Sequence, residues 1–168
     1  MFERFKHFFA HDEARDPLPL PFDYDLVLLD AWELAEGGIL EAYEQLHPQL
    51  RQHEAAEIEI AEDIDDDNGA YTVFADGTRY DIYGADVKGD AWTLATIAFF
   101  EIVNAALAHA SHRFYALYAG NDLAGIFLTE DQFRIARERI ARRADWPWTP
   151  VNRAPDFGFP AHQVEQPA

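Results

Sequence analysis

The sequence contains no cysteine, one serine and two lysines among its 168 residues, and each scarcity excludes a kind of chemistry. Without cysteine, disulfides, thiolate metal sites and thiol nucleophiles are all excluded. The single serine, Ser111, lies between His109 and His112 without the G-x-S-x-G turn of a serine hydrolase, and such close neighbours rarely assemble into a triad. Neither a G-x-G-x-x-G loop nor a Walker A lysine is present. We therefore expect no catalytic residues and no cofactor.

Positive charge is also scarce in this protein. There are 13 Lys and Arg against 31 Asp and Glu, which gives a formal net charge of −18. Nucleic acid and anionic membranes would repel such a chain, whereas a basic protein would be attracted to it. The charge is segregated: residues 12–67 hold 18 acidic and 2 basic side chains, a net of −16, whereas residues 134–143 hold five arginines and one glutamate, a net of +4. These blocks are either solvated faces, or pair within the fold, or serve an external partner.

Long apolar segments are few, and the most apolar one is residues 91–110. It contains Thr93, Thr96, Glu101 and Asn104, which fall on one side of a helix. A glutamate in the middle of lipid is costly, so this segment predicts a mostly buried helix of a soluble protein. The first residues of the chain contain no continuous apolar stretch of the kind found in signal peptides. We expect a cytoplasmic protein with no membrane partner.

The pattern along the chain predicts a single α+β domain over residues 30–145. Residues 1–29 are predicted to form an amphipathic segment, with phenylalanines at helical spacing, followed by a proline-rich connector. Residues 146–168 are predicted to form a tail rich in proline and aromatic residues. The domain therefore lies between two termini of unusual composition.

Within the domain, helical segments alternate with strands. Periodicity predicts helices over residues 30–50 with a break at Gly37-Gly38, over 91–109, and from 130 to about 144. Asp90 is predicted to cap the second helix, and residues 129–132 form a capping box that opens the third. Strict alternation over residues 55–64 predicts a half-buried strand with Glu57 and Glu59 on its outer side. Two hairpins are predicted to turn at Asp76-Gly77 and at Gly120-Asn121-Asp122. The order of elements predicts a mostly antiparallel sheet of about five strands with helices packed on one face.

The segment EDIDDDNG, residues 62–69, invites comparison with a calcium-binding loop, but its register fails. If the loop starts at Asp63, then Gly69 lies one place too late and the twelfth position is Phe74 in place of glutamate. The closely spaced histidines occur without an H-E-x-x-H motif or nearby cysteine. We expect no metal site, and interpret the segment either as an acidic turn or as a patch that meets a cationic surface.

The segment RFYALYAGNDLAGIFLTEDQF, residues 113–133, resembles the C-terminal signature of small bacterial immunity proteins from polymorphic-toxin systems. The residues that carry the resemblance are Phe114, Tyr115, Gly120, Asn121, Asp122, Phe127, Leu128 and Thr129. By itself, the Gly120-Asn121-Asp122 corner is also a typical tight turn. The resemblance implies a compact α+β protein that neutralises a secreted toxin domain by binding it.

Charge and resemblance together predict a non-catalytic protein that neutralises a cognate, basic toxin domain. Many toxin domains act on nucleic acid and are basic, so an acidic protein would be steered onto them and would cover the substrate groove. Two alternatives stay open: an adaptor that binds a permanent partner through its apolar termini, and a hydrolase that uses carboxylates. The candidate partner-binding residues are an acidic set of Glu57, Glu59, Asp63, Asp65, Asp66 and Asp67, and a smaller patch of Tyr118, Asn121 and Asp122.

Overall fold

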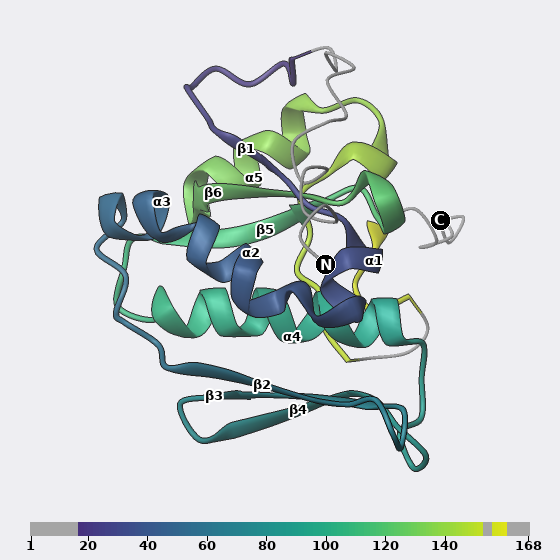
Figure 1. Cartoon of the computed structure of the whole chain (residues 1–168). Helices are drawn as coiled ribbons and strands as arrows, with labels where there is room; N and C mark the ends of the chain where they lie inside the picture. The colour runs from purple at the N-terminus through teal and green to yellow at the C-terminus, as the bar shows by residue number, and fades with distance from the viewer. Residues whose placement is uncertain (1–16, 153–155, 161–168) are drawn as a thin grey trace.

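The computed structural model describes residues 17–152 and 156–160, and in it two three-stranded antiparallel sheets flank a central helix, α4 (Ala91–Ala106) (Figure 1). The predicted α+β class is confirmed, whereas the prediction of one sheet of about five strands is wrong. The reason lies in α4, whose residues 95–100 are all buried. Six residues exceed one helical turn, so the helix is covered on every side. It packs against β4 of one sheet and β5 of the other, which keeps the two hairpins apart.

The first sheet has the strand order β1–β6–β5. It consists of β1 (Leu26–Leu28), β6 (Ala124–Thr129) and β5 (His112–Leu117). The predicted hairpin between β5 and β6 is confirmed. Strand β1 lies in the segment predicted to be a connector, because three residues are too few to show a strand's alternation. It joins the sheet through its pairing with the buried strand β6.

The second sheet has the order β2–β3–β4 and consists of β2 (Ile60–Asp65), β3 (Ala70–Ala75) and β4 (Thr78–Tyr83). The predicted hairpin at Asp76-Gly77 is confirmed, and both turn residues have positive φ, 45° and 80°, as a type I′ turn requires. The inner face places Tyr71, Val73 and Ile82 in the core. The opposite face points away from α4 (Figure 1).

The predicted helical segment 30–50 is divided into short pieces. In order these are α1 (Ala31–Glu33), the π-type segment η1 (Leu34–Gly38), α2 (Ile39–Gln45) and α3 (His47–Gln52). The predicted break is confirmed, since Gly37 has a φ of 95°. Lack of space also favours glycine at this position, because a β-carbon there would lie 2.5 Å from Ile64 Cδ1. Asp30 and Asp90 cap the helices that follow them.

The last helix, α5 (Glu130–Arg139), begins with the predicted capping box of Thr129 and Gln132. It ends about five residues earlier than predicted, and a 3₁₀ turn, η3 (Arg143–Asp145), follows. The tail then packs back onto the domain: Trp148 is 7% exposed and forms a bridge with Ala116 of β5. The indole of Trp146 donates to the carbonyl of Ile140. The beginning of the predicted tail is therefore part of the core.

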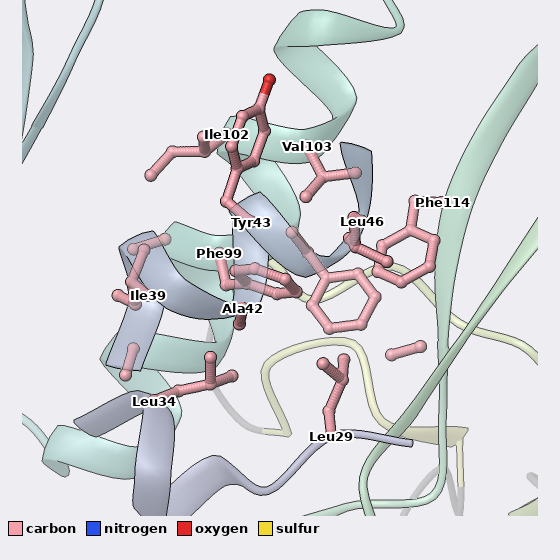
Figure 2. Close-up of a cluster of buried hydrophobic side chains, with 14 of the residues drawn as sticks. Leu29, Leu34, Ile39, Ala42, Tyr43, Leu46, Phe99, Ile102, Val103 and Phe114 are labelled. Carbon is pink, nitrogen blue, oxygen red and sulfur yellow. The ribbon is translucent and has the colours of Figure 1, made fainter. Parts of the chain in front are cut away.

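The main core forms where α2, α4 and β5 meet (Figure 2). Tyr43 of α2 packs there with Phe99 of α4, and Phe114 of β5 stacks on Phe100 with ring centroids 4.9 Å apart. The predicted N-terminal amphipathic segment lies mostly outside the described residues. Within the described residues no helix has the length and apolar character needed to cross a membrane.

Candidate protein-binding surface

The outer face of the β2–β3–β4 sheet carries carboxylates from two of its strands. Strand register places Asp63 of β2 and Asp81 of β4 on either side of Thr72. The Thr72 hydroxyl donates to Asp81, and Arg79 forms an ion pair with the same carboxylate at 2.8 Å. The bond from Arg79 is the main reason why the pKa of Asp81 is lowered. Asp63 is exposed, so it is the member of this face most available to a partner.

The turn between β2 and β3 is organised by Asp65. Its carboxylate accepts hydrogen bonds from the side-chain amide of Asn68 at 2.6 Å, from the Asn68 backbone at 3.0 Å and from the Asp67 backbone at 3.1 Å. These bonds lower the pKa of Asp65, and the Asn68 side chain has the largest effect. Asp65 therefore shapes the turn, while the side chains of Asp66 and Asp67 are exposed at its tip. In the described part of the chain no group of three or more potential metal ligands is placed to hold an ion.

Glu57 and Glu59 do not lie on a strand, which corrects the prediction that a strand begins near residue 55. The backbone of Ala56 donates to Ala106 at the end of α4, and Glu59 exchanges hydrogen bonds with Asp76 at the β3–β4 turn. These contacts take the place of ladder hydrogen bonds. Both glutamates are exposed, but they lie where β2 begins, whereas Asp66 and Asp67 lie beyond its end. The acidic set thus runs along the whole length of β2.

The second predicted patch lies at the short 3₁₀ turn η2 (Gly120–Asp122), between β5 and β6. Asn121 and Asp122 are exposed there. Tyr118 has a φ of 59° and is half-buried, because its ring packs on the smaller core cluster and its carbonyl accepts from the Trp148 indole at 3.1 Å. The Gly120-Asn121-Asp122 corner is thus a turn, as its residue types predict. Tyr118 packs against the domain, so only part of its ring is open to a partner.

The structure brings η2 and the beginning of α4 together. Ala119 and Gly120 line a groove of about 340 Å³ with Asp90, Trp92 and Thr93. In Figure 1 the β2–β3 turn lies at the same end of the molecule, below the beginning of α4. The two predicted patches therefore lie at one end of the fold but on different layers.

A pair of exposed tryptophans lies between these layers, and the sequence analysis missed it. Trp32 of α1 and Trp92 of α4 are 44% and 46% exposed, and their ring centroids are 5.1 Å apart. Each tryptophan is the last residue of the same tripeptide, Asp-Ala-Trp. In both copies the aspartate caps a helix and the tryptophan is the second residue of that helix. The repeated tripeptide at residues 30–32 and 90–92 was the available signal.

The basic residues of α5 form local contacts. Arg134 pairs with Asp131 and Glu138 of the same helix. Arg137 lies over the rings of Phe133 and Trp146. These contacts link the basic block to its own surroundings, so they do not neutralise the acidic set.

A histidine pair occupies a separate groove at the end of the β1–β6–β5 sheet where β5 begins. The rings of His53 and His112 are 4.3 Å apart, and His53 also stacks on Phe127 at 4.7 Å. The pKa of each histidine is lowered, chiefly by burial. Spacing along the chain suggests other pairings, His47 with His53 and His109 with His112, but the fold brings His53 and His112 together. The observed pair joins the end of α3 to β5.

Comparisons with known proteins add no relative: no family model, no curated protein and no solved structure matches this chain.

Proposed function

We propose that this protein is a non-catalytic, acidic, cytoplasmic binding protein that neutralises a cognate basic toxin domain by covering its active surface. The observation that carries the proposal is the set of exposed carboxylates before β2, on β2 and in the turn that follows it: Glu57, Glu59, Asp63, Asp66 and Asp67. The resemblance of residues 113–133 to immunity proteins supports the same function.

The electrostatics of the fold favour an external partner over internal pairing. Like charges gathered on one surface repel each other and oppose folding. In the basic block, residues 134–143, Arg134 pairs with Asp131 and Glu138 within α5, and Arg142 pairs with Asp145 just after it. A basic partner would relieve the repulsion among the carboxylates and would be steered toward them from solution.

The adaptor alternative has less support. It requires the apolar termini to be available to a partner. The phenylalanine-rich N-terminal part lies outside the described residues, and in the tail Trp148 and Pro150 are buried and Trp146 is held against α5 by Arg137. These side chains contribute to the stability of the domain itself.

The experiment is affinity capture from native lysate with the immobilised chain, at about 20 mM and about 500 mM NaCl, because salt screens charge-steered association. We expect one basic protein to be retained at low salt and less of it at high salt. That protein should be toxic when expressed alone and harmless when expressed together with this chain.

A pair of charge-reversal variants tests the surface. Asp66→Lys/Asp67→Lys should lose the captured protein, whereas the control Glu44→Lys/Glu54→Lys, which changes the net charge equally at exposed positions elsewhere, should retain it. Retention by both variants contradicts the assignment of the surface. Capture of a protein whose toxicity the chain does not relieve contradicts the proposed function.

A further inference from the structure

The geometry points to a specific anchor at the end of the fold where the β2–β3 turn lies: an arginine side chain of the basic partner stacks on the Trp32–Trp92 pair and enters the groove beside Trp92. We call Trp32, Trp92 and this groove the tryptophan face. The inference deepens the proposed function, on which it rests, by naming the group that the partner supplies.

The first argument is the exposure of the indoles. Among the described residues the large apolar side chains that are exposed are Trp32, Ile64, Phe74 and Trp92, and the two tryptophans contact each other. Almost half of each indole surface is open to solvent, which is a large exposed area for side chains of this size. Tryptophan is enriched among the residues that contribute most to binding at protein interfaces.

The second argument is the shape of the surface beside the pair. The groove of about 340 Å³ begins at Trp92, and its walls include the apolar side chains of Ile97, Leu123, Trp148 and Pro150. Ile97, Leu123 and Trp148 are each less than 9% exposed, so these walls are fixed by core packing. A cleft with rigid walls next to an exposed aromatic pair suits a single long side chain.

The third argument is charge, which decides the occupant. Among the described residues, those that line the groove include Asp90 and Asp156 but neither Lys nor Arg. Asp90 caps α4 through one oxygen: both the Thr93 backbone and the Thr93 hydroxyl donate to its Oδ2. Asp30, the cap of α1, lies two residues before Trp32 and accepts from the Trp32 backbone at 2.8 Å. Carboxylates therefore border the indoles at both helix starts.

Arginine matches all three features. Its planar guanidinium stacks on indole faces, its fork of N–H groups pairs with carboxylates, and its methylene stem suits apolar walls. Lysine would satisfy the charge but not the stacking. An apolar anchor would fill the groove but would leave the bordering carboxylates without a counter-charge. A basic toxin domain presents arginine as an ordinary part of its surface.

The test uses the whole protein labelled with ¹⁵N and two short peptides as probes, acetyl-Gly-Arg-Gly-amide and its glutamine counterpart. We expect the arginine peptide to shift the indole N–H signals of Trp32 and Trp92, while the signal of Trp146, whose indole bonds to Ile140, stays in place. The glutamine peptide should have no such effect. The signals are assigned from Trp32→Phe and Trp92→Phe. If the two indoles do not respond to the arginine peptide, the inference is overturned, whether or not the amides of residues 66 and 67 shift.

Substitution gives a second readout that separates this inference from the proposed function. Trp92→Ala should weaken binding of the arginine peptide about fivefold, and Trp92→Phe should restore most of it, because a phenyl ring retains part of the stacking. In the capture experiment, Trp32→Ala/Trp92→Ala should release the basic partner at least about tenfold faster than wild type. Unchanged release, with capture lost in Asp66→Lys/Asp67→Lys, overturns the anchor and leaves the proposed function standing. If wild type captures no basic protein, the proposed function fails, and the indole titration still decides whether the face binds arginine.

Discussion

Gly125 shows how one position in the sheet is fixed by space and not by backbone conformation. A β-carbon added there would lie 1.9 Å from Cζ of Phe114, whose ring is fully buried and stacked between neighbours in the core. The ring cannot easily move aside, because Phe100 and Phe127 lie against it, with centroids 4.9 and 4.6 Å away. The glycine therefore makes room for the Phe114 ring against β6.

We predict that Gly125→Ala destabilises the protein by about 1–3 kcal/mol, the usual cost of forcing extra volume into a packed core. The measurement is urea unfolding followed by tryptophan fluorescence. Gly125→Ala combined with Phe114→Leu should cost less than the sum of the two single changes, since the smaller side chain vacates the space. Strict additivity would show that Phe114 is not the obstacle.

The histidine pair makes stability depend on pH. The pKa of His53 is lowered by burial and by the charge of His112, and the pKa of His112 is lowered by burial. In the unfolded chain the histidine pKa is about 6.5. The unfolded chain therefore binds more protons than the folded chain as the pH falls below that value. Asp25 opposes this effect at His53.

We therefore predict that the free energy of unfolding, measured against that of His53→Gln/His112→Gln, falls as the pH is lowered from about 7.5 to about 5. The comparison with the variant removes the contribution of the many carboxylates, which both proteins share. NMR titration of the two imidazoles should give pKa values below 6.5 for both. A relative stability independent of pH would mean that the two rings are solvated in the folded protein.

At the scale of elements, Glu62 joins the second sheet to α2. Its carboxylate lies on the inner face of β2, where it accepts from the Leu40 backbone at 3.0 Å and from the hydroxyl of Tyr71. Because Gly38 has no side chain to cap α2, this glutamate supplies the missing acceptor from another element. Burial, followed by the bond to Glu62, raises the pKa of Tyr71, so the tyrosine remains a donor.

Glu62→Ala should cost about 1–3 kcal/mol of unfolding free energy, because it leaves a buried hydroxyl and a helix N–H without their acceptor. Glu59→Ala, at an exposed position on the same segment, is the matched control and should be close to neutral. In a double-mutant cycle with Tyr71→Phe, the double mutant should lose less unfolding free energy than the sum of the losses in the two single mutants. Additive losses would show that the two side chains act independently.

Element boundaries of local origin were predictable from sequence, whereas the arrangement of the elements was not. The Asp90 cap, the Thr129 capping box and the Asp76-Gly77 turn each depend on a few adjacent residues, and all three are confirmed. The division into two sheets depends on α4 being covered from both sides, which involves residues far apart in the chain. The acidic residues of the candidate site could be predicted from the charge of the sequence. The contact between Trp32 and Trp92 could not, because it joins positions 60 residues apart.

At the scale of the whole molecule, the net charge of −18 opposes folding, because like charges repel each other. Exposed carboxylates along β2 and its turn are close enough to repel each other when the Debye length is about 30 Å at 0.01 M salt, but much less when it is about 3 Å at 1 M. The clustered negative charge that would attract a basic protein therefore also destabilises this protein by self-repulsion at low salt. Salt should stabilise this protein, whereas most of its other interactions depend little on ionic strength.

We predict that the melting temperature rises by several degrees between about 10 mM and about 500 mM NaCl, and that Asp66→Lys/Asp67→Lys shows a smaller rise, since it removes part of the repulsion. Calcium chloride at matched ionic strength distinguishes screening from site binding. An equal effect of the two salts is expected, because Asp65 directs its carboxylate into the turn and the described residues form no cluster of ligands. A much larger rise with calcium at low concentration would show that Asp63, Asp66 and Asp67 rearrange around the ion, and the surface assigned here to a protein partner would then be a cation site.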